Sequence, residues 1–267
     1  MMFTDVKAPV PYVKSDLIPD IFAHCFTTRL GGVSSGYLSS LNLGVSRGDG
    51  PENVKKNYKL ICDACGFDSG KLVFFHQIHS RTVLPVTLDD AFAPYERDMQ
   101  EADGAVTDEA GVTLAVFTAD CVPILLCDEK RRAIGAVHAG WRGTMLGIAG
   151  EGVRALIENY GCKAENIRAA IGASIGSCCF ETNSDVPEAA EKLLGGEARR
   201  FIVSRGNGKY LVDLRGINRR VLELAGVKSE NIDVSGECTV CNCDKYWSHR
   251  VTNGRRGVQA AMIMLKR

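Results

Sequence analysis

Residues 112–143 read VTLAVFTADCVPILLCDEKRRAIGAVHAGWRG, and this stretch decides the fold class. It holds three short runs rich in apolar and β-branched residues: Thr113–Thr118, Val122–Cys127 and Ala133–Val137. Such runs predict strands, several of them apolar on both faces and so deeply buried. Beyond this stretch, apolar residues recur at helical spacing from Met145 to Tyr160, which predicts one long helix that Gly161 ends. The pattern indicates an α/β fold.

The rest of the chain adds elements of both kinds. Helices are predicted at Pro51–Cys65, Pro187–Leu194 and Leu214–Ala225, and strands at Ile21–Thr28, Lys71–Phe75, Thr82–Val86, Ile167–Ile171 and Val258–Leu265. The first of these helices has Pro51 at a first-turn position and Gly66 just past its end, the usual signals at the two ends of a helix. No internal repeat divides the sequence. We therefore expect residues 1–267 to form a single α/β domain with mixed β-sheets.

The composition is that of an ordinary globular protein. The 267 residues carry 32 Lys and Arg against 32 Asp and Glu, and a net charge of zero gives no support to a nucleic-acid or anionic-membrane partner. The most apolar stretch, Val112–Cys127, is too short to span a bilayer. The N-terminus lacks the basic and apolar regions of a secretion signal. We therefore expect a cytoplasmic protein whose 11 cysteines are mostly reduced.

Three polar residues at the ends of apolar runs are candidates for chemistry. His79 lies in FFHQIHS, Cys121 in FTADCVPILL and His138 in GAVHAGWRG. Two histidines and a cysteine form a known catalytic zinc set that leaves a fourth position open, and such a zinc lowers the pKa of bound water to about 7. The alternatives are histidines and a cysteine that only pack in the core, or a metal-free nucleophile pair of Cys121 and His138.

Two further features have both a functional and a structural interpretation. Arg142, beside Trp141 at a helix start, could bind an anion or pair with a carboxylate. In CTVCNCDKYWSHR, Cys238, Cys241 and Cys243 with His249 suggest a structural zinc site. A second C-x-x-C is missing, so packed, reduced cysteines are favoured there.

The motifs taken together resemble one known family. FTTRLGGVS, SLNLG, HQIHS, EADGAVT, TADCVPILL, GAVHAGWRG, IGASIGSCCFE and CTVCNCDKYWSHR occur in the order and spacing of the laccase-domain, or polyphenol oxidase, family. Its members are now described as purine nucleoside phosphorylases, and one is known as a peptidoglycan editing factor. The resemblance runs from about Phe26 to the C-terminus.

The resemblance implies a fold and a site. The fold would be a layered α/β/β/α sandwich. One zinc ion per chain would be bound by His79, Cys121 and His138, and Arg29, Asn42 and Gln77 would line the substrate pocket. The sequence departs from the family pattern at Ala173 and Ser177, where prolines are usual, and at Val251, where an arginine is usual. These departures bear on the local loop shape and on one anion contact.

The leading functional interpretation is a zinc-dependent purine nucleoside phosphorylase acting on adenosine, inosine, guanosine or methylthioadenosine, with deamination of adenosine as a second activity. Arg29 or Arg142 would hold the phosphate. The alternatives are a hydrolase that edits peptidoglycan precursors through Cys121 and His138 or zinc-bound water, and a polyphenol oxidase with a single copper. A multicopper site is disfavoured because five histidines are too few. An interaction protein with a closed structural zinc site is the non-enzymatic alternative.

Overall fold

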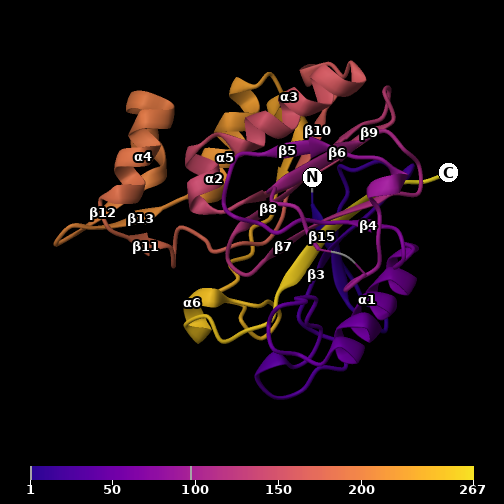
Figure 1. Ribbon diagram of the computed structural model, residues 1–267. Helices are drawn as coiled ribbons and strands as arrows, with labels where there is room; N and C mark the ends of the chain where they lie inside the picture. Colours follow the sequence, from indigo (N-terminus) through magenta and orange to yellow (C-terminus); the bar gives the residue numbers. More distant parts are fainter. Residues whose placement is uncertain (1, 97) are drawn as a thin grey trace.

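The computed structural model describes residues 2–96 and 98–267, which form two large sheets and one small one (Figure 1). The first six-stranded sheet has the order β1 (Phe3–Val6), β2 (Tyr12–Ser15), β3 (Phe22–Thr27), β15 (Gln259–Leu265), β7 (Thr113–Thr118), β4 (Leu72–Val73). The second has the order β14 (Ile232–Val234), β10 (Arg168–Ile171), β8 (Val122–Asp128), β9 (Ala133–Ala139), β6 (Gly104–Thr107), β5 (Val83–Pro85). A three-stranded sheet of β11 (Glu181–Thr182), β13 (Lys209–Val212) and β12 (Ile202–Gly206) lies to one side.

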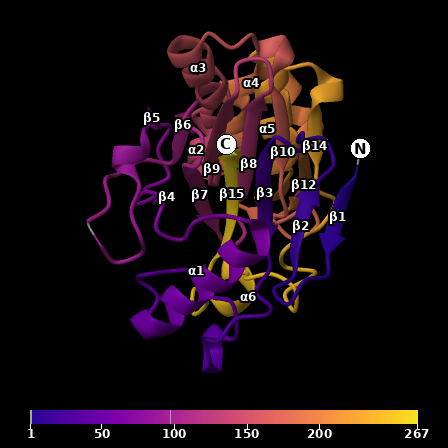
Figure 2. The same ribbon diagram turned by 90° about the vertical axis from the view of Figure 1, so that its right-hand side faces the viewer.

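The two large sheets pack face to face, and helices cover their outer faces (Figure 2). Apolar side chains of both sheets, such as Leu114, Ile263 and Leu125, form the buried layer between them. On the outer face of the second sheet lie α3 (Ile148–Tyr160) and α5 (Leu214–Leu224), and on that of the first lies α1 (Pro51–Cys65). Both large sheets mix parallel and antiparallel pairs, for example β4 with β7 and β8 with β9. The predicted α/β fold with mixed sheets, layered α/β/β/α, is confirmed.

The helix predicted at 51–65 has the predicted ends. Pro51 occupies the first turn, and Gly66 follows in the left-handed conformation (φ 76°), its N–H bonded to the carbonyl of Cys62. The helices predicted near 187–194 and 214–225 are also confirmed, as α4 (Asp185–Leu194) and α5. Strands occur in all the stretches where the sequence predicts them, with ends that differ by up to two residues.

The helix expected from Met145 to Tyr160 is confirmed over α3, with Gly161 at its end, but Met145 belongs to a separate short helix. That helix, α2 (Trp141–Met145), is followed by Leu146 and by Gly147, which has a φ of 77° and precedes α3. Such a φ breaks the helical hydrogen-bond ladder, whereas the apolar spacing continues across the break and hides it. Strands β1, β2, β6 and β14 and the small sheet were not predicted from the sequence.

Three connections bring polar residues to one edge of the sandwich. The chain passes from β7 in the first sheet to β8 in the second through residues 119–121. The loop between β4 and β5 also crosses from one sheet to the other. Strand β9 ends against α2, near the same edge. Sites are common at strand ends because a rigid sheet holds them while loops give access.

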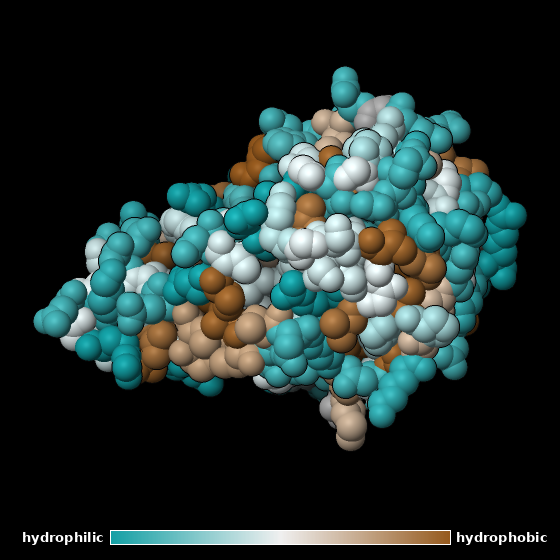
Figure 3. Space-filling model, turned by 90° about the horizontal axis from the view of Figure 1, so that it is seen from below, coloured by the Kyte–Doolittle hydropathy of each residue, from teal (hydrophilic) through white to brown (hydrophobic). Residues whose placement is uncertain are grey.

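The surface carries only small apolar areas on the face seen from below (Figure 3). Large exposed apolar side chains such as Tyr37, Leu146 and Val251 are ordinary for a protein surface. Among the described residues, no helix is long and apolar enough to cross a membrane.

Candidate metal centre and substrate pocket

His79, Cys121 and His138 converge on one point. His79 lies in the loop between β4 and β5, Cys121 in the turn between β7 and β8, and His138 in β9. One ligand atom from each lies within 4.8 Å of the other two. The two imidazole rings are 4.9 Å apart between centroids and nearly perpendicular, at 81°. The arrangement matches what a metal needs, ligand atoms from different directions around a common centre.

Asp103 orients both histidines from behind. Its carboxylate is fully buried, and one oxygen accepts hydrogen bonds from His138 Nδ1 at 2.8 Å and from the backbone N–H of His79 at 3.0 Å. The other oxygen accepts from the backbone N–H and the hydroxyl of Ser80, at 2.6 and 2.7 Å. Because Asp103 occupies His138 Nδ1, a metal would bind at Nε2 and displace the proton from that nitrogen. Such carboxylate–histidine pairs are typical around bound zinc.

The charges at the site perturb its titration. Burial alone would raise the pKa of Asp103, but hydrogen bonds from His138 and Ser80 lower it to about 2. Burial alone would lower the pKa of His138, but the neighbouring Cys121 and Asp103 raise it to about 9. Burial, His138 and Arg142 lower the pKa of His79 despite the opposing effect of Asp103. His79 is therefore held as the neutral imidazole that metal binding requires.

Close packing fixes the position of the His79 ring. His79 has a φ of 61°, which is uncommon for a residue with a side chain. Its ring lies directly against Gly140, where a Cβ atom would overlap His79 Nδ1. This contact requires glycine after the AVHA run of β9 and explains the glycine in GAVHAGWRG. Within the described chain, His79 Nδ1 is buried and has no hydrogen-bond partner.

The three residues fit a zinc ion of the catalytic type. Two imidazoles and a thiol are ligands that zinc accepts, and three protein ligands leave a fourth position open. His138 also has the carboxylate partner on its other ring nitrogen that metal-binding histidines usually have. A pocket adjoins the three residues, so the open position would face substrate.

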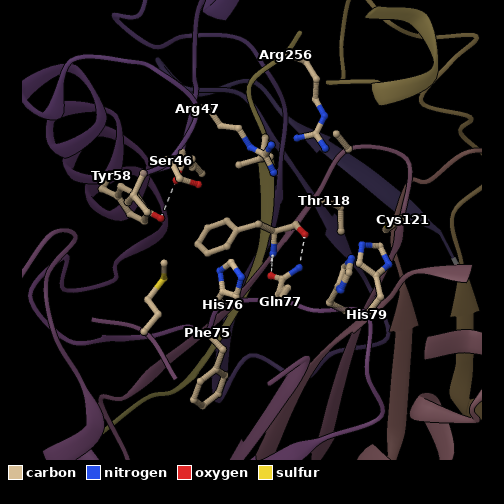
Figure 4. A pocket seen from close by; sticks show the side chains of 18 residues that line it. Ser46, Arg47, Tyr58, Phe75, His76, Gln77, His79, Thr118, Cys121 and Arg256 are labelled. Carbon is tan, nitrogen blue, oxygen red and sulfur yellow. Dashed lines mark hydrogen bonds between the residues drawn. The ribbon is translucent and has the colours of Figure 1, made fainter. Parts of the chain in front are cut away.

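The pocket beside the triad has an aromatic wall (Figure 4). Phe117 and Tyr58 line it and meet edge to face, with centroids 6.4 Å apart. Gln77 also lines the pocket, but its amide donates to the carbonyl of Phe117 and accepts from the Phe117 N–H, both at 2.7 Å. Gln77 therefore holds the Phe117 backbone in place. The wall suits a flat, apolar ring system.

Two arginines line the same pocket. Arg47 and Arg256 extend toward each other across from His79 and Cys121 (Figure 4). Burial and the nearby charge of Arg47 lower the pKa of Arg256 to about 10. Among the described residues, Arg256 Nε is buried without a hydrogen-bond partner. Two adjacent guanidinium groups with unused donors favour an anion such as phosphate.

Sequence analysis missed both arginines because they lie in loops, SRGDG and NGRRG, that read as ordinary solvated turns. The turn before Arg256 uses left-handed Asn253 and Gly254, with φ values of 49° and 90°. At Gly257 a Cβ atom would come within 2.8 Å of the Trp247 ring. The glycines on either side of the Arg255–Arg256 pair were the one sequence feature that could have indicated a site, since glycine is used where the backbone packs closely.

The other residues that sequence analysis singled out lie outside the pocket lining. Arg29 stacks on Trp247, 4.1 Å from the ring centroid, and donates to the carbonyls of Ser39 and Cys243. Arg142 is exposed and stacks on its neighbour Trp141. The substrate-binding roles of Arg29 and Arg142 remain predictions, and neither side chain lines the pocket.

Asn42 is fully buried behind the pocket wall. Its amide oxygen accepts from the N–H groups of Gly44 and Val258, and its amide nitrogen donates to Asp49 at 3.0 Å. These bonds shape the stretch that carries Arg47. The predicted substrate contact of Asn42 remains a prediction, while its positioning of the wall is visible in the structure.

The cysteines of the tail segment group differently from the set that the sequence suggests. Cys238 and Cys241 do lie together, but their companions are Cys178 and Cys179. Cys243 and His249 belong to neither group of metal-ligating side chains found among the described residues. The segment around 178 lies far away in sequence, so local spacing could not reveal this pairing.

Comparison with known proteins places the chain among relatives of the same fold. It is 36% identical to the mouse protein named purine nucleoside phosphorylase LACC1 over 268 residues, covering 98% of this chain but only 60% of that protein. It is 35% identical to purine nucleoside phosphorylase YlmD of Bacillus subtilis, covering 90% and 87% of the two chains. The crystal structure of YlmD from Geobacillus stearothermophilus matches with a TM-score of 0.94 and 32% identity over 99% of both chains.

A family match covers nearly the whole chain. Residues 23–266 match the family described as multi-copper polyphenol oxidoreductase laccase. This range includes every residue of the triad and of the aromatic and basic pocket walls. The resemblance that the sequence motifs suggest is confirmed, and the chain belongs to this laccase-domain family.

Proposed function

We propose that this protein is a zinc-dependent purine nucleoside phosphorylase. One observation carries the proposal: the His79–Cys121–His138 triad and the Arg47–Arg256 pair share one pocket with an aromatic wall. A metal site, an anion site and a flat apolar surface are what a purine nucleoside and phosphate together require. The names of the mouse and Bacillus relatives point to the same reaction.

The metal would be bound by His79, Cys121 and His138, with Asp103 fixing the tautomer of His138. A zinc ion there supplies a Lewis acid that polarises an electron-rich atom of the substrate. Zinc is favoured over a multicopper centre because, among the described residues, only this group of candidate ligands contains histidine. Two imidazoles do not suffice for several coppers.

Arg47 and Arg256 would bind phosphate, and the Phe117 wall would hold the purine. In phosphorolysis a phosphate oxygen forms a bond to the anomeric carbon while the bond from that carbon to the purine nitrogen breaks. The electron pair of the broken bond leaves with the purine, which takes up a proton. The products are free base and ribose 1-phosphate. The arginines contribute by placing the nucleophile against the anomeric carbon, which reduces the entropic part of the barrier.

Phosphorolysis is favoured over deamination of adenosine by the residues around the pocket. Zinc deaminases use a glutamate that carries protons but does not bind the metal. No Asp or Glu is among the described residues that line this pocket. Deamination therefore stays the second activity to be tested, with conversion of adenosine to inosine as its signature.

The test is the phosphate dependence of an Arg256→Gln variant. Loss of a charge-assisted contact costs about 1.5–3 kcal/mol, which corresponds to a rise in the KM for phosphate of roughly ten- to a hundredfold. The matched control is Arg255→Gln, because the neighbouring Arg255 stacks on Tyr37 and does not line the pocket. Inosine turnover measured against phosphate concentration gives both constants.

The result expected is a raised KM for phosphate in Arg256→Gln with the metal content unchanged, and wild-type behaviour in Arg255→Gln. Equal kinetics for Arg256→Gln and the wild type would contradict the assigned anion site. Absence of nucleoside turnover in zinc-loaded wild type would contradict the proposed function and favour the hydrolase alternative.

A further inference from the structure

A second group of sulfur ligands lies outside the pocket, where two loops meet. Cys178 and Cys179 lie in the loop between β10 and β11, and Cys238 and Cys241 lie in the loop after β14. One ligand atom from each of the four lies within 4.8 Å of all the others. Four thiols from two distant parts of the sequence therefore form one compact cluster.

The sulfur distances match a tetrahedral metal site. Cys241 Sγ is 3.7 Å from Cys178 Sγ and 3.5 Å from Cys179 Sγ. Zinc–sulfur bonds of about 2.3 Å in a tetrahedron place the sulfurs about 3.8 Å apart. A disulfide would need about 2.05 Å. The cluster is thus too open for a disulfide and has the spacing of four thiolates around one ion.

The backbone around Cys238 provides the environment of a metal-bound thiolate. The N–H of Gly176 donates to Cys238 Sγ at 3.2 Å, and the backbone N–H groups of Val240 and Cys241 also donate to it. The last two donors come from the C-x-x-C turn itself. Hydrogen bonds from backbone N–H groups to sulfur stabilise negative charge there without neutralising the ligand.

Two positively charged side chains lie near the cluster. Arg215 lies against Gly176, with its Nη2 3.0 Å from where a Cβ atom would stand, and donates to the carbonyl of Glu237 at 2.9 Å. Arg250 donates to the carbonyl of Cys179 at 3.0 Å. A zinc ion with four thiolates carries a net charge of −2, which these two cations would offset.

We propose that Cys178, Cys179, Cys238 and Cys241 bind one zinc ion in a closed structural site, separate from the triad. Binding forms four Zn–S bonds, releases the thiol protons to solvent and changes no oxidation state. Four thiolates in a tetrahedron select zinc or iron, and zinc suits a site whose role is to hold two loops without redox chemistry. The chain then binds two zinc ions.

The site would stabilise the turn that carries Cys121. Thr239, next to Cys238, donates its hydroxyl hydrogen to Asp120 at 2.6 Å, and the Arg250 N–H donates to the same carboxylate at 2.7 Å. Asp120 has a φ of 85° and precedes Cys121 directly. The loop that carries Cys178 and Cys179 also contacts Asp120, because the Ile175 N–H donates to the Asp120 carbonyl at 2.9 Å. A zinc ion in the cluster would therefore join the two segments that hold Asp120 and would position the triad cysteine indirectly.

Zinc content per chain tests the proposal. The wild type, purified from zinc-supplemented cells, is expected to hold two zinc ions by elemental analysis, Cys241→Ser one, and Cys121→Ala one. The matched control is Cys243→Ser, which changes a partly exposed cysteine two residues from Cys241 and outside the cluster, and is expected to keep two. Failure of this proposal can be distinguished from failure of the proposed triad site, because Cys121→Ala changes a ligand of the triad alone.

A second measurement on the wild type covers the case in which Cys241→Ser does not fold. Cys178 and Cys241 are exposed, so they should react quickly with iodoacetamide only after zinc is removed by a chelator. Peptide mass spectrometry reads the modification at each cysteine. Rapid alkylation of both in zinc-loaded protein, a disulfide within the cluster, iron in place of zinc, or a single zinc that Cys121→Ala removes would each overturn the proposal.

Discussion

At the scale of single residues, several buried polar side chains act by holding others in place. Asp103 accepts from both His138 and the backbone of His79, so one carboxylate contacts two candidate metal ligands. The Gln77 amide hydrogen-bonds to the Phe117 backbone, and the Asn42 amide hydrogen-bonds to the stretch of pocket wall that carries Arg47. A sequence motif cannot show whether such a residue contacts the substrate or holds another residue in place, because both roles use the same polar side chains.

His24 provides a prediction about pH at this scale. It is buried in β3, and its Nε2 accepts a hydrogen bond from the Ser15 N–H at 3.0 Å, so a proton on Nε2 would oppose that donor. Burial, helped by Lys14 and opposed by Asp20, lowers the pKa of His24 from 6.5 to about 4. The unfolded chain therefore binds a proton at a higher pH than the folded chain. The stabilisation is full above 6.5 and is lost as the pH falls toward 4.

Comparison with His24→Gln isolates the effect, since glutamine can accept the same N–H and both proteins share all other titrating groups. From about pH 7 to about pH 5, the wild type should lose about 2 kcal/mol more unfolding free energy than the variant. Urea unfolding at the two pH values measures this difference. Parallel losses in the two proteins would show that His24 titrates normally in the folded state.

At the scale of elements, periodicity predicts where helices and strands lie but not where two elements of the same kind meet. The apolar spacing through 145–160 holds across α2 and α3 because both pack on the same sheet face. The break depends on the backbone of Gly147 alone. Strand β1, with only four residues and a partly exposed pattern, lacks the apolar density that marks the buried strands.

Two glycine variants test the helix break. At Gly147 a Cβ atom would meet nothing closer than 3.8 Å, so only the left-handed backbone opposes a side chain there. Gly147→Ala should therefore lower the unfolding free energy by about 1–2 kcal/mol. Gly150, three residues further on within α3, has ordinary contacts for a Cβ atom at 3.4 Å. Gly150→Ala should therefore stabilise the protein by about 0.5–1 kcal/mol.

Urea unfolding measures the change in unfolding free energy for each variant. The two changes should have opposite signs although both variants replace glycine with alanine. Destabilisation of similar size in both variants would mean that crowding, and not backbone conformation, determines the cost at Gly147.

At the scale of the whole molecule, the site lies where the two large sheets are joined. His79 and Cys121 lie in connections between the sheets, and His138 belongs to the second sheet. The sequence predicts these three because each ends a strongly apolar run. It cannot predict Arg47 and Arg256, whose loops are local turns in sequence and meet only through the packing of 42–47 against 256–258. The cysteine cluster is hidden for the same reason.

In the proposed function, the triad and the arginine pair together perform phosphorolysis. The most direct measurement is phosphorus NMR of zinc-loaded protein incubated with inosine and phosphate, with free base quantified in parallel. We expect ribose 1-phosphate and hypoxanthine in equal amounts, and no base release without phosphate. Because His138→Ala removes a metal ligand, that variant should form neither product while remaining folded by circular dichroism. Free ribose released at the same rate with or without phosphate would show that the enzyme is a hydrolase and not a phosphorylase.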